Sequence, residues 1–525
     1  MEGILIWLLV IPLLGAVIGT CLKGERAPRL WALLVSLATA AATVLLATRF
    51  DFARSGEMQL LVSPEAFRLV DAGVSLTLGI DSISFWLIAL TGFLMPLAIA
   101  SSWESIAVRR KEYYAWMLLL EFAMIGVFAA RDLLVFYVFF ELTLIPMFFI
   151  IGIWGGAQRQ YAAIKFFLFT FTGSVLTLAG VVYLGLHSSS GGAPSFLIEN
   201  VIAAAQNLTP QARFWVFLAM LAGFAVKVPL FPFHTWLPLA HTEAPTAGSV
   251  ILAGVLLKLG TYGLLRLALP IGFVDVLEEL TPILGGLCLI GIIYGSLVAW
   301  VQQDIKKLVA YSSVAHLGFC VLGMLAMNHA GIQGSVLYMI NHGLSTGAMF
   351  LVIGMIYERY HTREISELSG LAKRMPRMAF FFVLFTLSSI GLPGLNGFPS
   401  EFLTLLGAFT SPRLGIFYGV VASLGIILSA VYMLHMVARV IFGPLKVPLI
   451  HGEDHDAAAP GDLGAREMAI LIPLAAVVVI LGVVPNLVLN TLEAPADKMI
   501  KQSTKSQIVL VERSAGMVSG MGVGE

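Results

Sequence analysis

Two ionisable residues inside long apolar stretches could together bind and release a proton. Lys227 lies near the middle of FWVFLAMLAGFAVKVPLFPFHTWLPLAH (214–241), and Glu141 ends FYVFFE in another apolar stretch. A charge at the centre of a spanning helix costs about 3 kcal/mol on insertion scales, so such residues usually have a function. A lysine holds its proton more firmly beside a carboxylate than away from one. We therefore predict that Glu141 and Lys227 form a proton switch, the alternative being a static ion pair that fixes two helices.

A second set of polar residues in apolar stretches could carry a proton onward. Lys258 lies in ILAGVLLKLGTYGLLR, His316 in AYSSVAHLGF and His342 in YMINHGLSTGAMF. Hydroxyl and amide side chains accompany the two histidines: Ser312, Ser313, Asn341, Ser345 and Thr346. Neutral imidazoles in a hydroxyl-lined path suit a proton relay. We predict that the histidines connect Lys258 to the carboxylate of Glu401.

Each of these residues also has a structural interpretation. Lys258 could extend its side chain to the membrane surface, although it lies deep in its stretch. A single membrane histidine often only hydrogen-bonds a neighbouring helix. Glu401 follows Pro399 and Ser400, so it begins a helix, where the helix dipole favours a carboxylate without any transport role.

Three further residues are weaker candidates for the relay: Glu121, His234 and His241. Each is about as compatible with packing as with proton transfer. Pro238 lies between the two histidines and disrupts a shared helical face, so we expect no metal site there. The 441–466 loop contains His451, Glu453, Asp454, His455 and Asp456. It is interpreted as a solvated acidic loop rather than a metal site, because nothing frames its two histidines.

The elements that position these residues are membrane spans. The chain has 525 residues, of which 58% are hydrophobic and 12% charged, whereas a soluble domain carries about 25% charge. Apolar stretches near the ~20 residues that a bilayer requires predict an all-α integral membrane protein with about fourteen spans. They fall near 4–22, 30–48, 82–102, 113–130, 132–153, 162–186, 213–238, 247–268, 277–300, 307–327, 331–358, 377–409, 415–441 and 467–489.

The span around Lys227 is interrupted. Pro229 and Pro232 each remove a backbone donor and displace the carbonyl four residues back. The carbonyls of Ala225 and Val228 are therefore predicted to be free and to form a polar pocket beside the lysine. Such a break is tolerated in a bilayer only where protein or a water-filled cavity surrounds it.

A second interrupted span indicates an internal repeat. FFVLFTLSSIGLPGLNGFPSEFLTLLG (381–407) contains two prolines and three glycines at its break and one charge, Glu401. Each interrupted span is the fourth of a five-span block, and an odd number of spans makes the blocks inverted. Interrupted helices at matching positions of inverted repeats indicate a transport pathway. The predicted domains are 1–112 (three spans with a surface hairpin at 50–80), 113–270 and 271–441 (the two repeats), and 442–525 (acidic loop, last span and tail).

Charge and motif content exclude several other functions. The formal net charge is zero, which argues against nucleic-acid binding. Cys21, Cys288 and Cys320 have no CxxC spacing, so no iron–sulfur or zinc site is expected from this chain alone. No nucleotide-binding motif is visible, so redox chemistry must belong to a partner. Basic residues gather in loops after odd-numbered spans, among them Lys306 and Lys307, which predicts that these loops face the cytoplasm.

Several segments together resemble the proton-translocating, antiporter-like subunits of respiratory complex I. They are FYVFFELTLIPMFFIIGIWGG, KVPLFPFHTWLPLAHTEAPTAGSVILAGVLLKLGTYGLLR, AYSSVAHLGF, YMINHGLSTGAMF and LPGLNGFPSEF. The similarity covers about 80–440. It is greatest to the M type, the counterpart of mitochondrial chain 4. The reasons are that the twelfth-span charge is a glutamate, that IIGIWGG fits this type, and that no long amphipathic helix is expected after the last span.

The resemblance implies a role for each candidate. Glu141 and Lys227 would form the ion pair, Lys258 the central relay and Glu401 the exit carboxylate. His316 and His342 would belong to the hydrophilic axis between them. The family has an aspartate in WLPDAH where this chain has Leu239. This departure puts in doubt any acidic group at the end of the broken helix, though not the relay itself.

The resemblance also implies the setting. The chain would be a proton-pumping subunit of an NADH:quinone oxidoreductase in a bacterial inner membrane, beside L-type and N-type subunits. NADH, FMN, iron–sulfur clusters and quinone would bind to partner subunits, with no cofactor in this chain. Two alternatives stay open: a subunit of a multi-chain Na⁺/H⁺ antiporter or membrane-bound hydrogenase of the same fold, and a scaffold of the membrane arm that does not pump.

Overall fold

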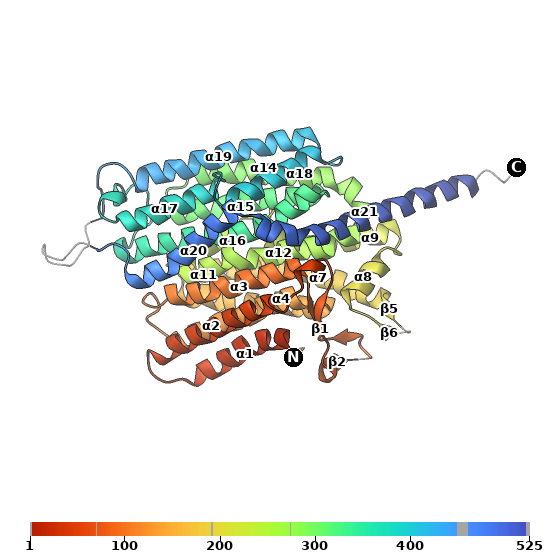
Figure 1. Cartoon of the computed structure of the whole chain (residues 1–525), viewed down its shortest axis with the longest axis horizontal. Helices are drawn as coiled ribbons and strands as arrows, with labels where there is room; N and C mark the ends of the chain where they lie inside the picture. The colour runs from red at the N-terminus through yellow and green to blue at the C-terminus, as the bar shows by residue number, and fades with distance from the viewer. Residues whose placement is uncertain (1–2, 70, 191–192, 273–274, 449–459, 521–525) are drawn as a thin grey trace.

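The protein is a bundle of long helices that run side by side (Figure 1). The computed structural model describes residues 3–520 except 70, 191–192, 273–274 and 449–459. The predicted acidic loop at 451–456 therefore lies outside the described residues. Within the described part, twelve helical segments are long and apolar enough to cross a membrane, which confirms the all-α membrane fold.

These twelve segments match twelve of the expected spans to within a few residues. They are α1 (Ile4–Cys21), α2 (Ala27–Ala47), α3 (Ser82–Ser101), α4 (Arg110–Ala129), α5–α6 (Leu133–Leu142 and Leu144–Trp154), α7 (Arg159–His187), α11–α13 (Thr246–Gly272), α14 (Val276–Trp300), α15 (Ile305–Leu325), α16 (His329–Tyr360), α19 (Ile416–Val440) and α20 (Ala465–Val483).

The other two expected spans are the two interrupted ones. The first consists of α9 (Pro210–Lys227) and the short α10 (Leu237–Glu243), separated by an irregular turn. The second consists of α17 (Pro376–Ser389) and α18 (Gly397–Thr410). Both breaks were predicted from their prolines and glycines. The inverted relation of the two five-span blocks, and with it the domain division, stays a prediction.

The helices that carry the candidate relay lie at the centre of the bundle. In the most apolar part of α16 every position is buried, as are 94% of positions in α15 and in Thr246–Gly272. Only 33% are buried in α2 and in α20, whose remaining positions carry apolar side chains suited to lipid. In Figure 1, α1 and α19 lie at opposite edges, with α12, α15 and α16 between them. Ionisable groups on these central helices are therefore shielded from lipid by protein.

The helix that carries Lys258 is irregular. Two π-helical turns, Leu252–Leu256 and Leu264–Ala268, interrupt it and leave the short α-helical pieces α11 (Thr246–Ile251), α12 (Leu257–Gly263) and α13 (Leu269–Gly272). π-helical turns are rare and occur frequently at functional sites. Lys258 is the second residue of α12, directly after the first π turn.

The surface hairpin predicted at 50–80 is present as two nested pairs of short strands. β1 (Gln59–Val62) pairs with β4 (Leu78–Ile80), and β2 (Arg68–Leu69) pairs with β3 (Val74–Ser75), all antiparallel. Between α7 and α9 lie a third pair of short strands, β5 (Ser189–Ser190) with β6 (Ala193–Pro194), and the short helix α8 (Ile198–Ala205). These last elements were not predicted from the sequence.

The expectation that no long helix follows the last span was wrong. α21 (Asn486–Gly520) is a 35-residue helix directly after α20. Its first part is fixed to α3, where Ser82 Oγ donates to the Thr491 carbonyl at 2.7 Å and Trp86 Nε1 donates to Thr491 Oγ1 at 2.8 Å. Its last part extends beyond the bundle (Figure 1). The many charged and polar residues of the tail concealed a helix that packing against α3 and α16 stabilises.

Candidate functional site

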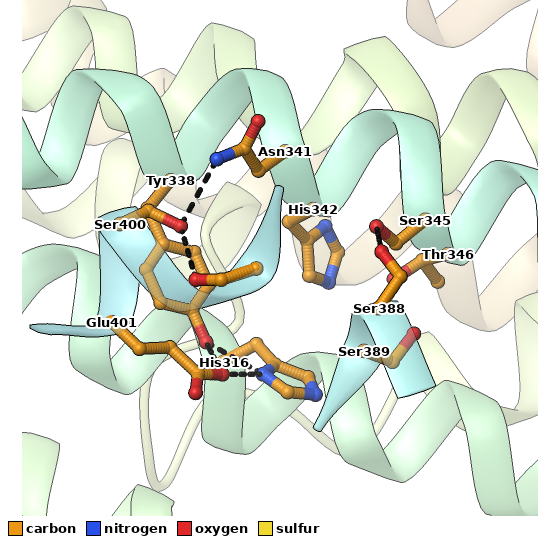
Figure 2. A pocket seen from close by; sticks show the side chains of 11 residues that line it. His316, Tyr338, Asn341, His342, Ser345, Thr346, Ser388, Ser389, Ser400 and Glu401 are labelled. Carbon is orange, nitrogen blue, oxygen red and sulfur yellow. Dashed lines mark hydrogen bonds and ion pairs between the residues drawn. The ribbon is translucent and has the colours of Figure 1, made fainter. Parts of the chain in front are cut away.

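Glu401 lies at the second helix break, in contact with the face of α16. Its Oε1 accepts a hydrogen bond from Tyr338 Oη at 3.0 Å, and Tyr338 Oη also lies 2.7 Å from His316 Nδ1 (Figure 2). His316 Nδ1 is 3.8 Å from the same carboxylate oxygen. All three side chains are buried. The predicted association of His316 with Glu401 is therefore present, with a tyrosine hydroxyl between them.

Lys258 and His342 form a second contact deeper in the bundle. Lys258 Nζ lies 2.8 Å from His342 Nδ1 and donates to the carbonyl of Ala253 at 2.5 Å. Ala253 belongs to the π-helical turn before α12, which places this carbonyl within reach of the side chain. Lys258 is fully buried, so the alternative in which it extends to the membrane surface is wrong.

A small polar cavity joins these two contacts. Its volume is about 20 Å³, and a cavity of about 10–15 Å³ by this measure holds a water molecule. Side chains of both histidines line it, together with Tyr338, Asn341, Ser345, Thr346, Ser388, Ser389, Gly397, Ser400 and Glu401. The ring centres of His316 and His342 are 5.7 Å apart, a separation that one water molecule can bridge. Figure 2 shows His342 between the Glu401 group on one side and Ser345, Ser388 and Ser389 on the other.

The second break is fixed by an amide and two serines. Asn396 ends the break and is fully buried. Its Oδ1 accepts from Ser388 Oγ at 2.5 Å and from Ser345 Oγ at 3.2 Å, while its carbonyl accepts from Asn341 Nδ2 at 2.5 Å. These bonds connect α16 to both halves of the interrupted span. They satisfy polar groups that would otherwise be unpaired inside the bilayer.

Gly391 makes room for the carboxylate of Glu401. Its φ of +71° lies in the left-handed region, and a Cβ there would lie 2.1 Å from Glu401 Oε2. Only glycine adopts this conformation without strain and leaves that space free. The glycine found in the sequence pattern thus has two reasons to be there.

Lys227 lies at the end of α9, directly before the first break, and is almost completely buried. Its Nζ donates to Thr143 Oγ1 at 3.2 Å and lies 4.9 Å from the centre of the Phe140 ring. A hydroxyl and a cation–π contact are modest compensation for a buried ammonium. Among the described residues, Glu141 makes no contact with Lys227 within the 4.0 Å of an ion pair, yet the two charges lie close enough to influence each other.

The pair predicted from the sequence is thus brought close, without direct contact. Glu141 Oε1 is buried without a hydrogen-bond partner among the described residues. The predicted pocket of free carbonyls is contradicted at Ala225, whose carbonyl accepts from Leu230 N at 2.9 Å. Trp236 Nε1 binds the Val226 carbonyl at 3.0 Å and closes the turn further. The chain after Pro229 folds back, and the Leu230 backbone N–H and the Trp236 indole use these two acceptors.

The helix with Lys258 packs closely on the end of α9. A Cβ at Gly260 would lie 3.0 Å from Lys227 Cβ and 2.8 Å from Val228 Cγ2. Glycine therefore allows the backbones of α12 and α9 to approach each other beside Lys227. The two lysines lie on adjacent elements, one at the start of the proposed relay and one at its centre.

His241 and Lys306 extend the polar axis on the other side of Lys258. His241 is fully buried, neither ring nitrogen has a partner among the described residues, and its ring stacks on Phe350 at 4.7 Å. The charges of Lys258 and Lys306 both act on its imidazole. Lys306 was assigned to a loop but lies in α15, buried, with its Nζ donating to the Ala244 carbonyl at 2.6 Å.

In the described part of the chain, neither of the other weak candidates contacts a side chain of this axis. The His234 ring stacks on Phe231 and meets Tyr294 edge-on, with ring centres 5.7 and 5.3 Å away, which agrees with the packing interpretation. Glu121 in α4 is fully buried, and neither carboxylate oxygen has a hydrogen-bond partner in the described part of the chain. Within that part no group of three potential ligands could hold a metal ion.

Comparison with known proteins identifies the family. Residues 130–429 match the family model "NADH:quinone oxidoreductase/Mrp antiporter, TM", and residues 56–127 match "NADH-ubiquinone oxidoreductase chain 4, amino terminus". NADH-quinone oxidoreductase subunit M of Rhodobacter capsulatus is 42% identical over 98% of this chain and 100% of its own length. The chain belongs to the subunit M family of NADH-quinone oxidoreductases.

Other members of the subunit M family and a solved structure agree with this assignment. NADH-ubiquinone oxidoreductase chain 4 of Chondrus crispus is 44% identical, covering 79% of this chain and 81% of its own length. A chain of respiratory complex I from Thermus thermophilus with bound NADH superposes with a TM-score of 0.83 at 31% identity, over 95% of this chain and 99% of that one. The assignment to the M type, reached partly through a wrong argument about the tail, is confirmed on these grounds.

Sequence reasoning missed three residues in this subunit M family member. Tyr338 lies one helical turn before His342, so the spacing placed it on the same face, but a tyrosine in an apolar stretch gave no signal by itself. Asn396 lies within the break of the second interrupted span, where a buried amide could have been suspected. Lys306 gave no usable signal, because the burial of its position depends on how α10 packs against α15.

Proposed function

We propose that this chain translocates protons as a membrane-arm subunit of an NADH:quinone oxidoreductase. The observation that carries the proposal is the line of contacts from Lys258 through His342 and the polar cavity to His316, Tyr338 and Glu401. It crosses the most deeply buried helices of the bundle. The relatives of the subunit M family support the same function.

In the proposed sequence, Lys258 holds a proton at the centre of the membrane. Its ammonium passes the proton to His342 Nδ1, which lies at hydrogen-bond distance. A water molecule in the cavity carries it from the unpartnered His342 Nε2 toward His316. Glu401 then receives it at the second helix break and releases it to the far side. Each step moves one proton between neighbouring groups, so no charged group has to leave its place.

Lys227 and Glu141 are proposed to control the loading of Lys258. Because Lys227 is held by Thr143 and Phe140 and not by Glu141, a small shift of α5 against α9 would make or break the ion pair. A proton on Lys227 is stabilised when Glu141 approaches and destabilised when it withdraws. A neighbouring subunit that moves Glu141 would thereby couple its own state to proton transfer here.

The wider setting follows the family. We propose that partner subunits bind NADH, FMN, iron–sulfur clusters and quinone, that L-type and N-type subunits flank this chain, and that the complex lies in a bacterial inner membrane. The complex acts as an enzyme, and this chain contributes the proton path. The relatives named above favour this function over a subunit of a multi-chain Na⁺/H⁺ antiporter or hydrogenase.

The test compares Lys227→Ala with Lys307→Ala, which replaces an exposed lysine of α15. NADH–quinone turnover and proton pumping are measured in the same inverted membrane vesicles, with the amount of assembled complex checked on native gels. We expect Lys227→Ala to assemble but to lose both turnover and pumping, while Lys307→Ala behaves as wild type. Normal turnover and pumping in assembled Lys227→Ala would instead support the non-pumping scaffold or a path that avoids this lysine.

A further inference from the structure

We propose that the Tyr338 hydroxyl carries the proton from His316 to Glu401, which makes Tyr338 a further catalytic residue of this proton path. The inference rests on the proposed function and adds its last internal step. It concerns a residue that the sequence alone did not indicate.

The distances favour a path through the hydroxyl. His316 Nδ1 and Glu401 Oε1 are 3.8 Å apart, too far for a direct hydrogen bond. Tyr338 Oη lies between them, 2.7 Å from the ring nitrogen and 3.0 Å from the carboxylate oxygen. Both values are within hydrogen-bond range, so the phenol converts one long gap into two short links (Figure 2).

The hydrogen-bond roles follow from the single proton of the phenol. A tyrosine hydroxyl has one hydrogen to donate and can accept a second bond. With Glu401 ionised, that hydrogen points to Oε1, because a carboxylate only accepts. The bond to His316 must then run from Nδ1–H to the phenol oxygen. His316, Tyr338 and Glu401 thus form a row in which every donor points toward the carboxylate.

Such a row can transfer a proton with balanced charges. When His316 is an imidazolium, the N–H bond at Nδ1 breaks and the phenol oxygen takes that proton. The original Tyr338 O–H bond breaks at the same time, and its proton forms a new O–H bond on Glu401 Oε1. The products are a neutral imidazole, a neutral tyrosine and a carboxylic acid. The phenol never carries a net charge, which suits its burial.

The position of Tyr338 also links it to the upstream relay. Tyr338 and His342 lie one turn apart on α16, so one face of one helix presents both of them to the cavity. Tyr338 is 3% exposed, and the two side chains that contact its hydroxyl, His316 and Glu401, are buried as well. A proton that reaches His316 through the cavity therefore meets this hydroxyl before it meets Glu401.

The first experiment replaces Tyr338 with phenylalanine in the intact complex, with Tyr113→Phe as the matched control. Tyr113 is a fully buried tyrosine near the start of α4, and its ring packs against Tyr114 and Trp154. Pumping and NADH–quinone turnover are measured in inverted vesicles, normalised to assembled complex. We expect Tyr338→Phe to slow pumping by about tenfold, in line with the loss of a hydrogen bond to a charged group, and Tyr113→Phe to have no effect.

A second measurement separates relay from support. Replacing Tyr338 with mono- and difluorotyrosine keeps the hydroxyl and nearly the same shape but makes the phenol more acidic. A relay predicts that the pumping rate and its solvent deuterium isotope effect change with the number of fluorines. A purely structural hydroxyl predicts that neither changes. This comparison also decides the matter if Tyr338→Phe fails to assemble.

Glu401→Gln distinguishes failure of this inference from failure of the proposed function. If Glu401→Gln stops pumping while Tyr338→Phe and the fluorinated variants pump as wild type, the relay stands and the role of Tyr338 is refuted. If Glu401→Gln and Tyr338→Phe both pump normally, the path through Glu401 is itself wrong. Loss of pumping in both, with normal pumping in the Tyr113→Phe control, supports the inference.

Discussion

The two helix breaks satisfy their buried polar groups in different ways. At the first, the chain folds back on itself: Leu230 N and Trp236 Nε1 take the carbonyls of Ala225 and Val226, and Lys227 is left with one hydroxyl and an aromatic ring. At the second, Asn396 binds neighbouring helices, and Glu401 belongs to a network that continues through Tyr338. One break encloses an isolated charge, and the other exposes a carboxylate to a polar cavity.

This difference indicates a division of labour. When a partner of opposite charge lies near a charged group but out of contact, a small movement changes the electrostatic energy of that group strongly, because the surrounding medium has a low dielectric constant. A carboxylate whose hydrogen bonds are already formed can pass a proton on without rearrangement, because its hydrogen-bond partners are already in place. We infer that the region of Lys227 controls proton loading and that the region of Glu401 carries the proton out.

The strongest test of this comparison is Glu401→Gln, which keeps the shape of the side chain but removes its proton-binding capacity. We expect pumping to fall by at least about a hundredfold, as when a positioned proton acceptor is lost, with complex assembly unchanged. Vesicle pumping assays report the effect. A conservative Glu467→Gln change, at a carboxylate that pairs with Arg359 at 2.7 Å on the rim of the bundle, is the control. Equal losses of pumping in the two variants would mean that the carboxylate at the second break has no particular role in proton transfer.

Gly391→Ala asks whether the shape of the second break matters for conduction. The new Cβ would lie 2.1 Å from Glu401 Oε2, so the carboxylate must move, and we expect about a tenfold loss of pumping, equivalent to ~1.4 kcal/mol. Gly394→Ala is the matched control, because Gly394 also has a positive φ, +93°, but open space around it. Both variants should lose roughly 1–2 kcal/mol of stability from backbone strain. If both pump equally well, displacement of Glu401 has no consequence.

Lys306→Met asks whether the conducting region extends beyond Lys258. The change removes a buried ammonium whose charge acts on His241 and leaves the neighbouring Lys307, which is exposed, for a control Lys307→Met. We expect a several-fold loss of pumping in the first variant and none in the second. Native gels check assembly, since Lys306 also holds the Ala244 carbonyl at the end of α10. Reduced assembly with normal pumping per complex would make Lys306 a structural cap.

The smallest expected effect sharpens the picture of the first break. Thr143→Val removes the only hydroxyl that binds Lys227 in the described part of the chain, and we expect pumping to change by about twofold to threefold, equivalent to ~0.5 kcal/mol. Thr170→Val, at a buried hydroxyl that binds only the backbone of its own helix, is the control. A loss as large as that of Lys227→Ala would mean that the hydroxyl, and not movement of Glu141, determines the state of the lysine.

Much of this arrangement could be predicted from the sequence. Charges in apolar stretches are conspicuous, so Lys227, Lys258 and Glu401 were found from composition alone, and prolines and glycines marked both breaks. The histidines were predicted to connect Lys258 to Glu401, and the structure places Lys258 Nζ 2.8 Å from His342 Nδ1. The fold followed for the same reason, since the length of apolar stretches nearly determines a membrane bundle.

The remainder depends on tertiary geometry that no local pattern encodes. Whether Glu141 touches Lys227 is decided by the packing of α5 on α9, and the carbonyl of Ala225 was lost to a turn whose course the prolines do not determine. Tyr338 is an ordinary residue for an apolar stretch until His316 and Glu401 are placed on either side of it. Lys306 resembled a loop residue because burial at its position depends on how the short α10 packs against α15.

The π-helical turns change the direction in which side chains point along the helix of Lys258. Each such turn accommodates one residue more than the α-helix would, which rotates everything beyond it by about 100°. Lys258, which lies between the two turns, therefore faces a direction that a helical wheel drawn through 246–272 would assign wrongly. Deleting one residue from Leu252–Leu256 would remove the first π-helical turn without removing any charge, and it would turn the lysine away from His342. The direction in which the Lys258 side chain points thus depends on the number of residues before it in the helix. A one-residue deletion would therefore disable the path although every proton-binding group stayed in the sequence.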